Sequence, residues 1–303
     1  MVLYKCIIKK EENNIKILHY EDHMYPEKLR EIEKPPKILY ALGNVELLKE
    51  RNIAIVGSRC ATEYGILQAE KFAKELCLNG LNIVSGLAKG IDTIAHQCTI
   101  QQNKKTIAVL GSGFYNIYPK ENEKLFCEIL EKNGLIISEY EPNEGVKSSN
   151  FPERNRIISG ISMGVLVVEA AYRSGTSITA NYAKKQGKKL YAIPSNIGNN
   201  KGVGTARLIS KGAKIVINPK QILEDLKIEY KEFKKEKTKN RTVKIPEKFK
   251  KIYTSLENKE MTSDEISIKL NIPIYEINVQ LILMELEGYI IKKENGEYKV
   301  NNV

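Results

Sequence analysis

The stretch IAIVGSRCATEYGILQAEKFAKELCLNGLNIVSG, residues 53–86, has a short apolar run at each end, at 53–56 and 81–84. A glycine follows each run closely, and the segment between them (62–80) has the amphipathic spacing of a helix. A strand, a glycine turn, a helix and a second strand form the repeating unit of a parallel sheet. This stretch therefore predicts an α/β fold.

The same alternation continues along the central part of the chain. Five further apolar runs follow, at 106–110, 135–138, 164–168, 189–193 and 213–217. Amphipathic segments, such as the one at 121–134, separate most of them. Strands that are apolar on both faces and alternate with helices predict a doubly wound parallel sheet, covered by helices on both sides.

The pattern changes after Leu226. Residues 227–245 are strongly charged and contain few large apolar side chains, which indicates a basic linker. A smaller domain is expected at 246–303, where Thr262 and Glu265 have capping-box spacing and Asn295-Gly296 predicts a hairpin. Three helices followed by a hairpin are typical of a winged helix.

Composition and charge narrow the class of protein. The net charge of +11 and the five scattered cysteines favour a soluble cytoplasmic protein without a disulfide framework or zinc site. The N-terminal stretch lacks the pattern of a signal peptide, and no apolar run reaches the length of a membrane span, so we expect neither feature. The basic excess is uneven, since residues 227–251 carry 11 basic and 4 acidic groups whereas 252–303 carry 5 and 9.

Glycine, hydroxyl and cationic residues gather just after the predicted strands. In an open parallel sheet these positions share one edge, where ligands bind. Glycines there let backbone N–H groups approach an anion, and helix N-termini behind them favour negative charge. The candidate phosphate-binding residues at these turns are Gly57, Ser58, Arg59, Gly86, Lys89, Gly90, Gly111, Gly113, Arg173, Ser174, Gly175 and Thr176.

A second candidate anion-binding stretch is FPERNRIISG, residues 151–160. Pro152 fits a first helical turn, which would place Arg154, Asn155 and Arg156 near the positive end of a helix. Because residues two apart on a helix do not face the same way, the two arginines are expected to divide their roles. One would hold a phosphate, and the other would brace a carboxylate.

Familiar catalytic motifs are missing from the sequence. There is no P-loop, no dinucleotide-binding fingerprint and no nucleophile elbow, and the three histidines do not suggest a metal site. Asp92 and Glu169 are interpreted as structural carboxylates, and His96 as a packing residue. We therefore expect no catalytic residues, no metal and no cofactor.

The motifs IAIVGSR, SGLAKGIDTIAH, VLGSGFYNIYP, SEYEP, FPERNRIISG, VVEAAYRSGTSITA and GTARLISKGA resemble, in that order, those of the DprA/Smf family of bacterial DNA-processing proteins. The resemblance spans roughly residues 22–226, after a short N-terminal extension at 1–21. It implies an extended Rossmann-like domain, with Arg59, Lys89 and the arginines of FPERNR binding phosphate. One departure is Pro194-Ser195, where the family usually has proline-glycine.

Membership of this family would imply a function without known catalysis. It implies binding of single-stranded DNA, protection of incoming strands, loading of the RecA recombinase in natural transformation, and dimerisation. Phe114, Tyr115 or Tyr140 would then stack on bases. The alternative is an enzyme or sensor acting on a small nucleotide, as in phosphoribohydrolases, with Glu169 as the catalytic carboxylate.

The winged helix is expected to contact protein in preference to duplex DNA. Its probable recognition helix, IYEINVQLILMELEG, contains Glu276, Glu285 and Glu287 but no lysine or arginine. Phosphates would repel such a helix. Lys292 and Lys293 on the wing leave a weak contact with DNA open, and a transcription factor is the least favoured function.

Overall fold

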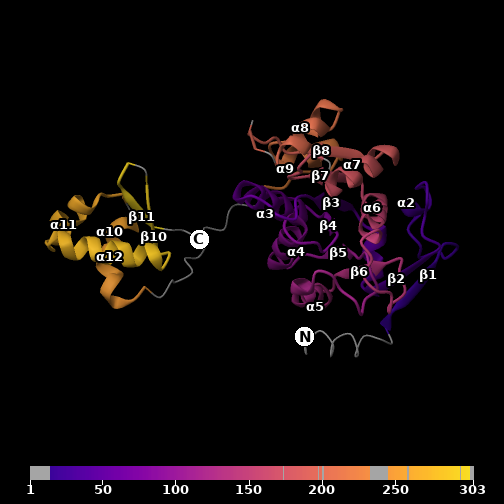
Figure 1. Ribbon diagram of the computed structural model, residues 1–303, viewed down its shortest axis with the longest axis horizontal. Helices are drawn as coiled ribbons and strands as arrows, with labels where there is room; N and C mark the ends of the chain where they lie inside the picture. The colour runs from indigo at the N-terminus through magenta and orange to yellow at the C-terminus, as the bar shows by residue number, and fades with distance from the viewer. Residues whose placement is uncertain are drawn as a thin grey trace. The chain divides into compact units, whose positions relative to one another are not determined.

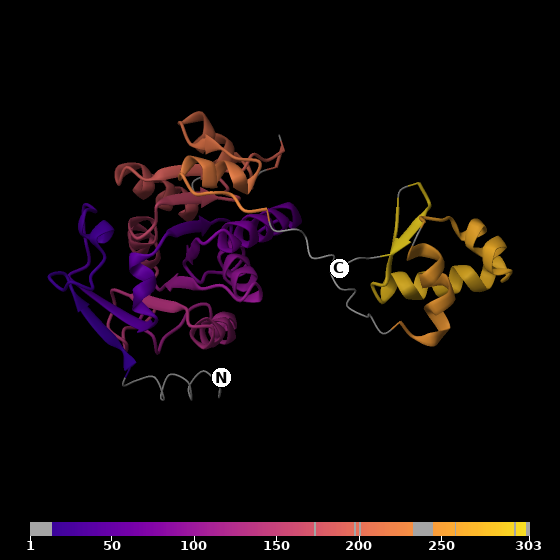
Figure 2. The same cartoon turned by 180° about the vertical axis from the view of Figure 1, so that it is seen from behind.

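The computed structural model describes residues 14–172, 174–196, 198–199, 201–232, 245–257, 259–293 and 295–300. The chain divides into two compact units, Met1–Glu232 and Phe233–Val303 (Figures 1 and 2). Each unit is described by itself below. Within the described ranges, no helix combines the length and the apolar character needed to cross a bilayer.

The first unit is built on a nine-stranded sheet with the order β1-β2-β6-β5-β4-β3-β7-β8-β9. Seven neighbouring strands, in the spatial order β6-β5-β4-β3-β7-β8-β9, are parallel to one another. At the other edge, β2 runs antiparallel to β6, and β1 runs antiparallel to β2. The strands are β1 (Lys16–His19), β2 (Ile38–Gly43), β3 (Asn52–Val56), β4 (Asn82–Ser85), β5 (Thr106–Val109), β6 (Leu135–Ser138), β7 (Gly164–Val167), β8 (Lys189–Ala192) and β9 (Lys214–Ile215).

Helices cover both faces of this sheet (Figure 1). On one face of the sheet, the apolar side chains of α3, α4 and α9 form a core, and α5 continues this layer over β5 and β6. On the other face, α2, α6, α7 and α8 form a second core. The helices are α2 (Glu27–Arg30), α3 (Glu63–Leu78), α4 (Ile91–Gln101), α5 (Glu123–Glu131), α6 (Asn150–Gly160), α7 (Gly175–Lys185), α8 (Val203–Ser210) and α9 (Pro219–Asp225), with 3₁₀ turns at Val45–Lys49 and Lys120–Asn122.

The predicted α/β fold is confirmed, since each of the seven predicted apolar runs overlaps a strand of the sheet. The sequence reading missed β1 and β2, which form the antiparallel edge of the sheet. The expected start of the domain at residue 22 therefore leaves out a paired strand. Its expected end at residue 226 leaves out Ile228, which is buried in the core of the same unit.

The second unit contains the elements of the predicted winged helix. They are a 3₁₀ turn at Glu247–Phe249, α10 (Lys250–Glu257), α11 (Ser263–Leu270), α12 (Ile274–Leu286), β10 (Ile290–Lys292) and β11 (Tyr298–Val300). The predicted capping box forms at the start of α11, where Thr262 and Glu265 exchange hydrogen bonds. The predicted hairpin also forms, as β10 pairs antiparallel with β11. Of the expected linker, residues 233–244 lie outside the described residues.

Candidate nucleic-acid interface

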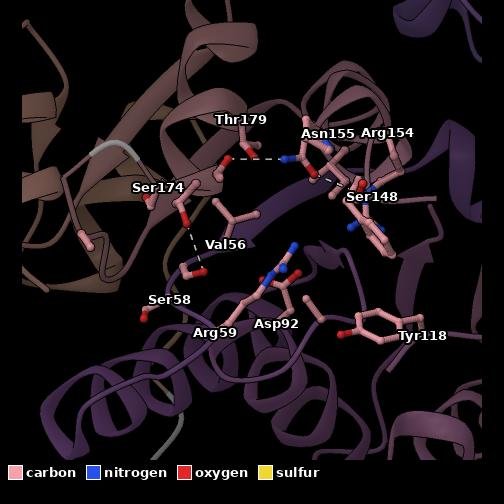
Figure 3. Close-up of a pocket in the computed structure, with 18 of the residues that line it drawn as sticks. Val56, Ser58, Arg59, Asp92, Tyr118, Ser148, Arg154, Asn155, Ser174 and Thr179 are labelled. Atoms are coloured by element: carbon pink, nitrogen blue, oxygen red, sulfur yellow. Dashed lines mark hydrogen bonds between the residues drawn. The ribbon is translucent and has the colours of Figure 1, made fainter. Parts of the chain in front are cut away.

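A pocket of about 620 Å³ opens at the carboxyl ends of β3 and β7. These neighbouring strands are the place where the chain switches from one half of the sheet to the other, which is where ligands bind in folds of this kind. Figure 3 shows Arg59 extending into the pocket from the loop after β3, with Thr179 of α7 and Asn155 of α6 opposite. The predicted residues that line the pocket are Gly57, Ser58, Arg59, Arg154, Asn155, Ser174, Gly175 and Thr176.

The N-terminus of α7 forms one wall of the pocket. Ser174 is its N-cap residue, but the side chain makes no capping hydrogen bond. The buried Ser174 Oγ has no partner among the described residues, and Thr176 Oγ1 donates to the Gly57 carbonyl at 3.1 Å. A helix N-terminus carries partial positive charge and exposed N–H donors. This wall therefore favours an anion.

Arg59 is the exposed cation of the pocket. It forms no ion pair with any carboxylate of the described residues, and its guanidinium carbon lies 5.8 Å from the centre of the Phe151 ring. The ring of Tyr118, half exposed, lies 5.6 Å from that of Phe151. Both aromatic residues line the pocket. A free guanidinium beside two accessible rings can hold a phosphate and stack a base at adjacent points.

Arg154 also lines the pocket, but its guanidinium is part of the interior. The residue is 3% exposed, and Nη1 donates to the carbonyls of Gly86, at 2.8 Å, and Val109. Burial, opposed by the nearby Asp92 carboxylate, lowers the pKa of Arg154 to about 10. Gly86 allows this approach, because a Cβ there would lie 2.6 Å from Arg154 Nη2. Arg154 therefore ties the ends of β4 and β5 together beneath the pocket.

Arg156 is placed differently from the sequence expectation. Its guanidinium forms a paired contact with Glu139, at 2.7 and 2.6 Å, and Nε donates to the Lys34 carbonyl. It lines a separate cavity of about 200 Å³ and not the larger pocket. Half of the expected division of roles is seen, since Arg156 braces the Glu139 carboxylate, whereas Arg154 donates to backbone carbonyls. Arg156 was expected to project over the pocket with the other cations, and this expectation was wrong, because Arg156 lines the smaller cavity.

Lys89 and Gly90 lie outside the lining of the pocket. The Lys89 ammonium is exposed and lies 2.5 Å from the Glu121 carboxylate, whose hydrogen bond raises the pKa of Lys89. Gly90 has a φ of +76°, and a Cβ there would lie 2.2 Å from the Ser58 carbonyl oxygen. This glycine therefore sets the close packing of the β4–α4 loop against the loop that carries Arg59.

Of the remaining predicted phosphate-binding residues, some lie at the pocket and others away from it. Gly111 and Gly113 do not line the pocket, because Gly111 packs under Phe151 and Gly113 packs against the backbone at 141–142. Asn155 Nδ2 donates to the Gly175 carbonyl at 3.5 Å and so links α6 to α7. Arg173 lies outside the described residues.

None of the aromatic residues expected to stack on bases, Phe114, Tyr115 and Tyr140, lines the pocket. Phe114 is fully buried in the core, and Tyr140 buries its hydroxyl. The aromatic residues that line the pocket are Tyr118 and Phe151. Phe151 belongs to the stretch FPERNRIISG, and its position at the start of α6 is the signal that places its ring at the pocket.

The interpretation of three polar residues as structural agrees with the contacts. Asp92 accepts a hydrogen bond from the Gly86 N–H at 3.0 Å. His96 is buried, with Nδ1 2.7 Å from Thr106 Oγ1, and burial together with Arg154 lowers its pKa to about 3. Glu169 accepts from the N–H and the hydroxyl of Thr62, at 2.9 and 2.7 Å, and so holds the N-cap residue of α3 in place. Glu169 does not line the pocket, whereas Asp92 does.

Comparison with known proteins places the chain in a family. The family model for DNA recombination-mediator protein A matches residues 16–227. Protein Smf of Escherichia coli is 35% identical over 292 residues, which cover 94% of this chain and 78% of that protein.

Two solved structures are similar in sequence and in fold. The structure of DNA processing protein A from Streptococcus pneumoniae has a TM-score of 0.67 at 40% identity, covering 76% of this chain and 79% of that chain. DNA processing protein A from Helicobacter pylori, studied for its single-stranded DNA binding mode, has a TM-score of 0.64 at 32% identity, covering 71% and 98%. Together with its pocket and its fold, these matches show that the chain belongs to the DNA recombination-mediator protein A family, which contains the DprA and Smf proteins.

Proposed function

We propose that this protein binds single-stranded DNA in the pocket and passes it to the RecA recombinase in the cytoplasm during natural transformation. It does so as a binding protein, without catalysing a reaction. The observation that carries the proposal is the exposed Arg59, without a carboxylate partner in the described chain, beside the rings of Phe151 and Tyr118. Family membership and the strand-binding relative from Helicobacter pylori support it.

The proposed binding mode uses two kinds of contact. Arg59 and the N-terminus of α7 hold successive phosphates, and Phe151 and Tyr118 stack on the bases between them. Lys89 contributes a further phosphate contact after exchanging Glu121 for the strand. Such an exchange is easy, because an ion pair between exposed side chains contributes little. Bases in a duplex are already stacked and paired, so this mode favours a single strand.

We further propose that the protein acts as a dimer that loads RecA. The short strand β9 lies at an open edge of the sheet, and the exposed side chains of Ile215 and Ile217 lie on or just after it. An open edge with apolar side chains is a natural surface for a second copy. Sedimentation velocity tests this point, since Ile217→Glu is expected to convert dimers to monomers.

The first experiment titrates the intact protein against fluorescent oligo-dT and a matched duplex at several salt concentrations. We expect tighter binding to oligo-dT, with an affinity that falls linearly with salt on a log–log plot, by about 0.7 per phosphate contact. Equal binding to both DNAs would reject the stacking mode. No binding to either at low salt would reject the proposed function and leave a small nucleotide as the ligand of the pocket.

Loading of RecA needs a separate measurement. RecA filament growth on oligo-dT is followed with and without the protein, and with Arg59→Ala as the strand-binding control. Faster filament growth that requires Arg59 supports the loading role. If the wild-type protein slows filament growth at every concentration, strand binding would stand and the loading role would not.

A further inference from the structure

The helix α12 of the second unit is apolar on more than the face it buries. Ile277, Leu281 and Met284 point into the core of the unit. A second stripe remains exposed, formed by Tyr275 at 67%, Val279 at 57%, Ile282 at 55% and Leu286 at 79%. A helix that is apolar around most of its circumference is usually covered on both sides.

The spacing of this exposed stripe indicates what covers it. Its members are separated by four, three and four residues, which is the alternation of the a and d positions in a coiled coil. The stripe runs along nearly the whole of α12, a length of about 20 Å for its 13 residues. A narrow straight seam of this kind fits the side of another helix better than a flat surface or an extended strand.

The charges beside the stripe exclude two common occupants. Glu276 and Glu285 flank it, Glu287 follows it, and α12 contains no lysine or arginine. Nucleic acid would be repelled by these carboxylates. A membrane surface is equally unsuitable, because helices that lie on anionic lipids carry lysine and arginine beside their apolar face.

The same charges also argue against a second copy of α12. Both copies would carry glutamates and no lysine or arginine beside the seam, so two such helices would form no complementary charge pairs along it. A helix with basic residues at the flanking positions would instead form complementary pairs along the seam.

We propose that the exposed stripe of α12 binds an amphipathic helix of another protein, one whose apolar seam is flanked by lysine or arginine. The second unit would then be a protein-docking module built on a fold better known for reading DNA. This function is separate from the binding of DNA at the pocket of the first unit.

The test uses the intact protein and two synthetic helical peptides of three heptads, labelled with a fluorophore. Both carry leucine at the a and d positions, and one carries lysine and the other glutamate at e and g. We expect the lysine peptide to bind and the glutamate peptide to bind at least tenfold more weakly. Ile282→Glu is expected to weaken binding of the lysine peptide at least tenfold.

The matched control is Leu67→Glu on α3, since Leu67 is a helical residue with the same exposed fraction of 55% as Ile282. It should bind the lysine peptide like the wild type. Equal binding of the two peptides, or binding unaffected by Ile282→Glu, would overturn the proposal. A dimer that Ile282→Glu dissociates and Ile217→Glu leaves intact would assign the stripe to a second copy. Oligo-dT binding, measured alongside, separates this result from the function of the pocket.

Discussion

The pocket of the first unit and the helix α12 of the second both lie where their folds often meet nucleic acid. The pocket combines an exposed arginine, a helix N-terminus and two accessible rings. The helix has an apolar stripe between carboxylates. The folds alone would suggest a phosphate-bearing ligand at the pocket and DNA at α12. The side chains favour an anion only at the pocket, so the proposed binding of DNA there rests on the chemistry of the site and not on the fold.

A similar contrast exists inside the first unit, among its arginines. Arg154 and Arg156 are buried, and their guanidinium groups are taken up by carbonyls and by Glu139. Arg59 is exposed and has no carboxylate partner in the described chain. We therefore expect substitutions of the buried arginines to act on stability first, and substitution of Arg59 to act on binding alone.

The largest effect is expected for Arg154→Leu. It removes two hydrogen bonds to carbonyls and leaves the buried Asp92 without its nearby cation. Breaking a buried charge pair from one side costs about 3–5 kcal/mol. Urea unfolding of the intact protein measures the loss in the first unit, with the exposed Arg51→Leu, at the opposite end of β3, as control. If Arg154→Leu lowers the free energy of unfolding no more than Arg51→Leu does, Arg154 is not a structural residue, and its role would be in binding, as for Arg59.

The second effect concerns acid stability and His96. Burial and Arg154 hold the pKa of His96 near 3, below its ordinary value of 6.5. The unfolded chain therefore binds a proton at His96 as the pH falls below 6.5, while the folded protein does not until about pH 3. Stability present above pH 6.5 is lost across this window, by about 3 kcal/mol between pH 6.5 and pH 4.

The difference between wild type and His96→Gln isolates this contribution. Glutamine can keep a hydrogen bond to Thr106 but does not titrate. Burial raises the pKa of Asp92, so this carboxyl acts in the opposite direction in both proteins and cancels in the difference. As the pH falls from 7 to 4, the urea midpoint of the wild type should decrease more than that of His96→Gln, so that the two midpoints converge or cross. A constant separation would mean that His96 is accessible to protons in the folded state.

These contrasts also mark how far the sequence alone could predict the molecule. The seven parallel strands were predictable because buried β-branched runs separated by helices have few other interpretations. Strands β1 (KILH) and β2 (ILYALG) were not, since they pair antiparallel and lie outside the repeating alternation of strand and helix. The pocket edge was predictable from the turns after the strands. Which arginine faces solvent was not, because it depends on partners such as Glu139, 17 residues away along the chain.

The third prediction concerns Arg59→Ala, which should weaken binding of oligo-dT without changing stability. Charge-assisted hydrogen bonds contribute about 1.5–3 kcal/mol, equivalent to roughly 10-fold to 100-fold in Kd. The salt dependence should become shallower by about 0.7 on the log–log plot, since one phosphate contact is lost. Arg51→Ala controls for net charge. If both variants weaken binding equally, the pocket would attract DNA by its general field and not by a specific contact.

The smallest effect is expected on the wing of the second unit, which carries the lysines that could bind DNA if the contrast between the pocket and α12 were wrong. Lys292 and Lys293 follow α12 on the wing, and Lys293 is already paired with Glu260 at 2.5 Å. The double variant Lys292→Ala, Lys293→Ala should change the Kd for oligo-dT and for duplex by less than about twofold, within the range of exposed charges that contribute little. A larger loss, above all for duplex, would mean that the wing binds phosphate despite the acidic helix beside it. The two units would then share the DNA, and the apolar stripe of α12 would have to bind its helix while the wing holds a strand.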